Sequence, residues 1–288
     1  MRRRLCLHRA ARAFASLGPL TLLPLLTPLA AWPADPADPS EGDPFKSMQW
    51  PELRKPYLGA GANTRFDDRV RVQGPAFAED PMNVPITVSA GLPGVQRLIV
   101  LVDRNPIRKV LELQPLAALP AVSFRFKLEQ GSPVRALAQT ADGVWHVGGT
   151  WVDSSGGGCT VAGGSRVDGS WTRTLGQVTG RVYAASPASQ SAEGRAASAD
   201  PAGAGTAARL RLRIMHPMDT GLVGGIPAFF VNKLAVRDGA DRELLRIQTF
   251  EPISENPVFS FEFARAPTGP LRIVGGDNNG NRIDSRVE

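Results

Sequence analysis

The sequence has 288 residues, of which 33 are Lys or Arg and 27 are Asp or Glu, giving a formal charge of +6. A hydrophobic content of 42% is enough to build a folded core, and two cysteines exclude a disulfide-dense scaffold and a four-cysteine zinc site. No apolar run reaches the roughly 20 residues that a membrane-spanning helix needs, so we expect no membrane insertion.

Residues 1–31 have the pattern of a cleaved secretory signal peptide. The first 14 residues hold five arginines and no acid, and an apolar stretch follows that ends in the small residues Ala30 and Ala31. Removing this segment takes away five of the 33 basic residues and no acidic one, so the formal charge falls from +6 to near +1. The positive charge of the full sequence therefore gives no support for a nucleic-acid partner.

The next segment, residues 32–47, is acidic and proline-rich, and we expect a flexible leader there. Residues 48–58 favour a short helix with Trp50 and Leu53 among its apolar anchors, although Pro51 and Pro56 interrupt the pattern. The first domain is therefore expected to begin at residue 48.

A series of short β-strands follows. Residues 121–129 alternate well between apolar and polar side chains, with Val122, Phe124, Phe126 and Leu128 on one face, and Asp142-Gly143 is typical of a hairpin turn between two strands. The other predicted strands are residues 84–88, 97–102, 134–140 and 144–152. Five short strands with turns between them predict a β-sandwich.

Cys159 follows this series of strands in a glycine-rich segment. It comes directly after Gly156, Gly157 and Gly158, and it is the only cysteine left after export, so it has no internal disulfide partner. Glycine adds no side-chain bulk and permits wide backbone freedom, which predicts a thiol on an exposed, flexible tether. No cation adjoins Cys159 in the sequence, so we expect an unactivated thiol with a pKa of about 8.5. An ordinary turn with an incidental cysteine is the alternative.

A second β domain is predicted at residues 209–288, after a linker at residues 162–208 that is rich in Ala, Ser, Gly and Pro. Alternating residues from 209 onward, two further strands at 244–250 and 259–263, and the Asn279-Gly280 turn all indicate antiparallel sheet. The remaining predicted strands are residues 229–236, 271–274 and 282–287. The predicted fold class is all-β, with two immunoglobulin-like β-sandwich domains after a cleaved signal peptide, the first at residues 48–161.

The common catalytic motifs are missing from this sequence. It contains no H-E-x-x-H, G-x-S-x-G or Walker sequence, and only His146 and His216 remain outside the signal segment. We therefore predict no catalytic residue and no cofactor. Met215, His216 and Met218 with Cys159 carry ligand types that suit Cu(I), whereas the simpler interpretation is that His216-Pro217 ends a strand. We assign no metal site.

The order of several motifs resembles a fusion of the two subunits of the SoxYZ sulfur carrier. The first half is similar to SoxY at residues 84–88, 101–106, 133–138 and 142–143, and then at the glycine-flanked Cys159. The second half is similar to SoxZ at residues 216–221, 253–257 and 277–280. The resemblance covers residues 48–288.

This resemblance implies a periplasmic, non-catalytic carrier whose two domains pair within one chain. Cys159 would be the covalent attachment site for sulfur intermediates, as in thiosulfate oxidation, with Gly156, Gly157 and Gly158 as its swivel. The implied partners are periplasmic sulfur-oxidising enzymes, or a quinoprotein dehydrogenase and its c-type cytochrome, beside which similar fused carriers are encoded. In SoxY the arm is the chain terminus, whereas here Thr160 and a second domain follow. The alternative is a structural or copper-binding accessory protein of a quinoprotein dehydrogenase system.

Overall fold

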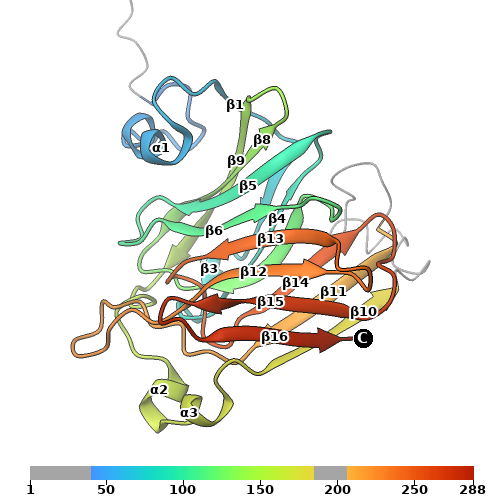
Figure 1. Ribbon diagram of the computed structural model, residues 1–288. Coiled ribbons are helices and arrows are strands. Elements are labelled where there is room, and N and C mark those ends of the chain that lie inside the picture. The colour runs from blue at the N-terminus through green and yellow to red at the C-terminus, as the bar shows by residue number, and fades with distance from the viewer. Residues whose placement is uncertain (1–39, 185–205) are drawn as a thin grey trace, which may run out of the picture. The chain divides into compact units, whose positions relative to one another are not determined.

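The computed structural model describes residues 40–184 and 206–288 (Figure 1). The predicted signal peptide, leader residues 32–39 and linker residues 185–205 lie outside the described residues. No helix in the described ranges is long and apolar enough to cross a membrane. The helices are α1 (Trp50–Leu58), α2 (Gly164–Asp168) and α3 (Trp171–Thr174).

The strands in chain order are short and numerous, as the sequence predicts. They are β1 (Thr64–Phe66), β2 (Val70–Gln73), β3 (Phe77–Ala78), β4 (Val84–Ala90), β5 (Val95–Val102), β6 (Lys109–Gln114), β7 (Ala121–Phe126), β8 (Ser132–Thr140), β9 (Trp145–Ser154), β10 (Val178–Ala184), β11 (Ala208–Ile214), β12 (Val231–Arg237), β13 (Glu243–Thr249), β14 (Val258–Phe263), β15 (Leu271–Asp277) and β16 (Arg282–Val287). The all-β prediction is confirmed. The sequence did not reveal β1, β2, β3, β6 and β10.

The strands form two sheets, and each sheet contains strands from both halves of the sequence. The first runs β1-β9-β8-β5-β6-β13-β12-β15-β16, with β3 beside β9, and the second runs β10-β11-β14-β7-β4-β2. The halves meet where β6 pairs with β13 (Figure 1) and where β7 pairs with β14, both antiparallel. These pairings satisfy the backbone hydrogen bonds that the edge strands of either half would otherwise leave open.

One hydrophobic core lies between the two sheets and includes side chains from both halves. Strand β11 shows how the sequence builds it, because Leu210, Leu212 and Ile214 point inward while the arginines between them are exposed. Phe126 from the first half and Phe261 from the second belong to the same buried cluster. The two sandwiches are therefore joined into one continuous core.

The predicted flexible leader is wrong for residues 40–47. Asp43 is completely buried and accepts two hydrogen bonds from Arg135 on β8, at 2.6 and 2.8 Å. Burial opposes ionisation of Asp43, but hydrogen bonds from Arg135 and from the Ser47 backbone outweigh it and lower the pKa of Asp43. The guanidinium of Arg135 lies 4.4 Å from the ring centroid of Trp50, which fixes α1 to the same point.

The predicted linker at residues 162–208 is wrong for residues 164–184, which form α2, α3 and β10. Strand β10 pairs with β11 along its whole length, from Val178 opposite Ile214 to Ala184 opposite Ala208. Gly180, the third residue of β10, weakens the strand pattern in the sequence because glycine is uncommon inside strands. A Cβ at this position would lie only 3.1 Å from the backbone oxygen of Arg211 and from a methyl group of Val287, so the lack of a side chain suits the packing.

Candidate functional site

Cys159 lies in the loop that follows β9, and its side chain is fully buried. The prediction of an exposed thiol on a tether is therefore wrong for the described conformation. The loop folds back onto the end of β7 and the residues after it, where the main chain of Lys127 and Leu128 forms one wall. The Sγ atom of Cys159 lies 3.7 Å from the backbone oxygen of Lys127 and can donate a weak hydrogen bond to it.

Glu129 holds the cysteine loop through both oxygens of its carboxylate. The backbone N–H of Cys159 donates to Oε2 at 2.8 Å, and the hydroxyl of Thr160 donates to Oε1 at 3.0 Å. From the second half, the hydroxyl of Thr220 donates to the backbone oxygen of Cys159 at 2.6 Å. The loop is therefore fixed by side chains from both halves of the chain.

Lys127 provides a buried cation near the thiol, which the sequence did not indicate. Its ammonium group donates a hydrogen bond to the backbone oxygen of Met218, and burial lowers the pKa of Lys127 to about 8. Burial also raises the pKa of Cys159 to about 12, and the carboxylate of Glu129 adds to this rise while Lys127 opposes it. The thiol is thus protonated and unreactive in this conformation.

The three glycines before Cys159 have distinct reasons to be glycine. Gly156 and Gly157 have φ angles of 95° and 86°, in the left-handed region that other residues rarely adopt. Gly158 has an ordinary φ, but a Cβ there would lie 2.3 Å from the backbone oxygen of Pro81 and 2.6 Å from backbone atoms of Leu128. They allow the loop to pack closely in this conformation, and their use as a swivel stays a prediction.

The motif at residues 216–221 lies directly against the cysteine loop. The backbone N–H of Met218 donates to Nδ1 of the buried His216 at 3.1 Å, and this turn directs the oxygen of Met218 toward Lys127. Asn256, from the motif at residues 253–257, accepts a hydrogen bond from the His216 backbone at 3.0 Å. Two motifs of the second half therefore form part of the site in which the Cys159 loop is packed.

The copper alternative finds no support in this arrangement. The sulfur of Met218 accepts the backbone N–H of Val231 at 3.4 Å, and Nδ1 of His216 already accepts the Met218 N–H. Within residues 40–184 and 206–288, no three His, Cys, Asp or Glu side chains are grouped so that they could hold a metal ion. His216 and Met218 instead have structural contacts that account for their burial.

The remaining sequence predictions in this region concern a turn and a histidine. The Asn279-Gly280 hairpin is confirmed, since β15 pairs with β16 and the carboxylate of Asp277 accepts the backbone N–H groups of Asn279 and Asn281, both at 3.0 Å. His146 is buried on β9 and its Nδ1 lies 2.7 Å from Asp67, in keeping with a structural role. Within residues 40–184 and 206–288, neither feature forms a hydrogen bond or an ion pair with the cysteine loop.

We expect His216 to make the protein less stable in mild acid. Burial lowers the pKa of His216 from 6.5 to about 4, an effect that the nearby Asp277 and Asp219 only partly offset. The unfolded chain therefore binds more protons than the folded one between these values, so stability present above pH 6.5 is lost as the pH falls toward 4. The shift corresponds to about 3 kcal/mol.

The measurement is urea denaturation of the wild type and of His216→Gln at several pH values. The difference in unfolding free energy between the two proteins isolates the contribution of His216 from that of the carboxylates. The wild type should lose about 3 kcal/mol more than the variant between pH 7 and 4. Parallel curves for the two proteins would contradict the assignment of His216 as a neutral, buried imidazole.

Family comparisons place two known domains in this chain. Residues 54–159 match the model of the sulfur oxidation protein SoxY, and residues 196–288 match that of the sulphur oxidation protein SoxZ. The SoxY match ends on Cys159 itself. No curated protein matches the chain at a significant level.

Several solved structures are similar to part of the chain. The sulfur carrier protein SoxY from Chlorobium limicola f thiosulfatophilum is 18% identical with a TM-score of 0.33, covering 37% of this chain and 96% of its own. A superoxide reductase (neelaredoxin) from Ignicoccus hospitalis is 13% identical with a TM-score of 0.29, covering 32% of this chain and 94% of its own.

Proposed function

The chain carries a SoxY domain followed by a SoxZ domain and so belongs to the SoxYZ sulfur carrier family, and we propose that it carries a sulfur intermediate covalently on Cys159. The observation that supports this proposal is the position of Cys159. It is the last residue of the SoxY match, and Thr220 of the SoxZ match binds its backbone oxygen. The cysteine loop thus joins the end of the SoxY match to a residue of the SoxZ match.

The chemistry of loading follows from a single thiol. With thiosulfate as the donor, a new S–S bond forms between Cys159 and the outer sulfur, the thiol loses its proton, and two electrons leave. An electron-accepting partner such as a c-type cytochrome must take these electrons. Because the pKa of Cys159 is raised to about 12 and the side chain is buried, the loop must open before this step.

The partners and the compartment are part of the same proposal. We place the protein in the periplasm, since the predicted signal peptide and a lone cysteine suit export, and we assign it no catalysis of its own. Periplasmic sulfur-oxidising enzymes, or a quinoprotein dehydrogenase with its cytochrome, are the proposed partners. Pairing of the two domains within one chain is visible in the strand contacts of β6 with β13.

The test is the intact mass of the protein isolated from its native host, before and after reductant. We expect a reducible adduct on the wild type and none on Cys159→Ser, whose backbone hydrogen bonds to Glu129 and Thr220 are retained. Melting of both proteins checks that the variant is folded. An unmodified wild-type thiol during growth on thiosulfate, or the same adduct on the variant, would contradict the carrier function and favour a structural accessory role.

A further inference from the structure

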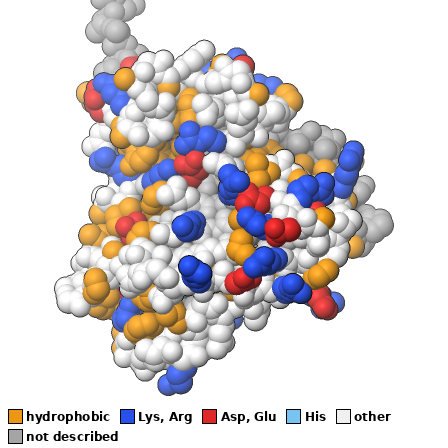
Figure 2. Space-filling model, in the orientation of Figure 1, with side chains coloured by type: hydrophobic (Ala, Val, Ile, Leu, Met, Phe, Trp, Pro, Cys, Tyr) orange, Lys and Arg blue, Asp and Glu red, His pale blue; other side chains and the backbone are white. Residues whose placement is uncertain are grey.

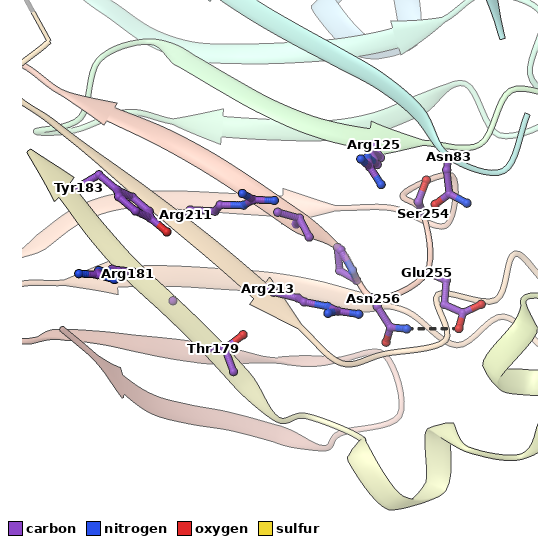
Figure 3. Close-up of a pocket in the computed structure, with 13 residues that line it drawn as sticks. Asn83, Arg125, Thr179, Arg181, Tyr183, Arg211, Arg213, Ser254, Glu255 and Asn256 are labelled. Carbon is purple, nitrogen blue, oxygen red and sulfur yellow. Dashed lines mark hydrogen bonds between the residues drawn. The ribbon is translucent and has the colours of Figure 1, made fainter. Parts of the chain in front are cut away.

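A groove lined with arginines lies on the outer face of the six-stranded sheet. Its volume is about 770 Å³, and it is bordered by β7, β10, β11 and the turn at residues 254–257. Figure 3 shows Arg211 and Arg213 on β11 lying between Arg125 on β7 and Thr179 on β10. Strand β14 runs between β11 and β7, and Val258, which pairs with Arg213, contributes a short side chain to the groove.

The arginines of this groove have no acidic partners among the described residues. Arg125, Arg181, Arg211 and Arg213 are all exposed, and none of them forms an ion pair within the described parts of the chain. Arg181 and Arg211 are directly opposite each other in the β10–β11 pair. Like charges directly opposite each other destabilise a sheet. A bound anion would relieve this repulsion and so stabilise the fold.

The other sheet shows the usual arrangement of surface charge. On its exposed face Arg97 and Lys109 both bind Glu112, and Arg246 binds Glu243. Figure 2 shows positive and negative side chains interleaved on the face where Figure 1 places β6, β13 and β12. The arginines of the groove differ from these paired cations, because four arginines without an ion pair in the described part of the chain lie around one groove on β7, β10 and β11.

The one carboxylate in the groove lining is already engaged. Oε1 of Glu255 accepts the backbone N–H of Ser165 at 3.0 Å and lies 3.3 Å from the side-chain amide of Asn256. Glu255 lies beside Asn256 at one end of the groove (Figure 3) and, among the described residues, forms no ion pair with the groove's arginines. Arg181 at the other side lies 5.6 Å from the ring of Tyr183, a contact that leaves its charge available.

We propose that this groove binds an acidic segment of a partner protein. Exposed guanidinium groups hold a single small anion weakly because water competes, whereas several carboxylates on one chain can engage the arginines on three strands together. Arginine is also enriched at protein interfaces, and complementary charge speeds the encounter of two proteins. The inference rests on the proposed carrier function, because a carrier must meet its enzymes.

The position of the groove connects it to the cysteine loop. Glu255 binds the backbone of Ser165, six residues after Cys159, and the neighbouring Ser254 donates to the backbone oxygen of Met82 at 2.6 Å. Met82 follows Pro81, whose backbone oxygen packs against Gly158. A segment seated in the groove thus contacts the elements that frame the base of the loop, so binding there is linked through the turn at residues 254–257 to the segment that holds Cys159.

The experiment measures binding of fluorescein-labelled poly-L-glutamate to the full chain by fluorescence anisotropy at low and at physiological salt. The triple variant Arg125→Gln, Arg211→Gln, Arg213→Gln should bind roughly tenfold more weakly than the wild type. The matched control replaces Arg173, Arg265 and Arg282 by Gln. These arginines are exposed and line no part of the groove, so this variant loses the same charge but should stay within about twofold of the wild type.

Three outcomes would overturn the inference. These are no binding of poly-L-glutamate, an equal loss in both triple variants, and displacement of the polymer by inorganic sulfate at an ionic strength where chloride has no effect. The last result would assign the groove to a small oxyanion. The adduct on Cys159 is measured separately in the groove variant. An adduct without polymer binding would reject the docking groove and leave the carrier function intact. Polymer binding without any adduct would reject the carrier function and leave the docking groove intact.

Discussion

Cys159 in the folded protein is expected to react with iodoacetamide about 100-fold more slowly than the same thiol in the unfolded chain at pH 8. The pKa of Cys159 rises from 9.0 to about 12 on burial, which lowers the thiolate population about 1,000-fold. A more basic thiolate is intrinsically more nucleophilic, and this recovers roughly a factor of ten. The measurement is the rate of mass increase on alkylation, with and without urea.

The variant Gly158→Ala tests whether the packing of the loop causes this protection. A Cβ at residue 158 would lie 2.3 Å from the backbone oxygen of Pro81, so the loop must leave its seat and expose Cys159. We expect alkylation in the folded variant to approach the rate of the unfolded chain. Gly164→Ala is the matched control, because a Cβ there meets nothing within 4 Å and its φ is not left-handed. Equal, slow alkylation of both variants would show that the loop is not held by its close packing at Gly158.

This protection has a consequence for how a carrier would work. A thiol that reacted freely would form disulfides with a second copy of the chain or with small thiols. Burial against Lys127 and Glu129 prevents this until something displaces the loop. Contacts from both halves, at Glu129 and Thr220, hold the closed position, so a partner that disturbs either half can release the cysteine.

The sequence identifies Cys159 and most strands, but it does not show the seat of the cysteine. The alternation at residues 121–129 predicts β7, yet it places Lys127 on the polar face, whereas Lys127 is buried. Glu129 is 30 residues from Cys159 and Thr220 is 61 residues away, so no local pattern links them. A run of glycines is compatible both with a mobile loop and with a loop packed closely against other backbone, so the sequence does not distinguish the two.

The pairing of strands between the two halves could not be predicted from the sequence. Alternation shows which face of a strand is buried, but it says nothing about which strand lies beside it. The sequence alone therefore gives two sandwiches, while the register of Arg246 with Gln114 and of Ser260 with Ser123 makes two continuous sheets. The groove of arginines arises from this pairing, since Arg125 and Arg213 come from different halves.

Arg135→Met is expected to destabilise the protein by about 3–5 kcal/mol, the largest loss that we predict for a single substitution. Arg135 is fully buried and binds Asp103 at 2.7 Å as well as Asp43 at 2.6 Å. These contacts join the two motifs at residues 101–106 and 133–138 that first indicated the family. Without the guanidinium, the buried carboxylates lose their counter-charge and residues 40–47 lose their attachment to β8.

Urea denaturation monitored by tryptophan fluorescence measures the loss, and two comparisons locate its cause. Arg272→Met removes an exposed ion pair with Asp284 and should cost under about 1 kcal/mol. If buried charge is the cause, adding Asp43→Asn and Asp103→Asn to Arg135→Met should recover part of the stability, because no carboxylate is then left unpaired. A triple variant less stable than Arg135→Met alone would contradict this cause. It would show instead that packing of the Arg135 guanidinium against Trp50 and Phe45 supplies the stability, and that its ion pairs contribute less.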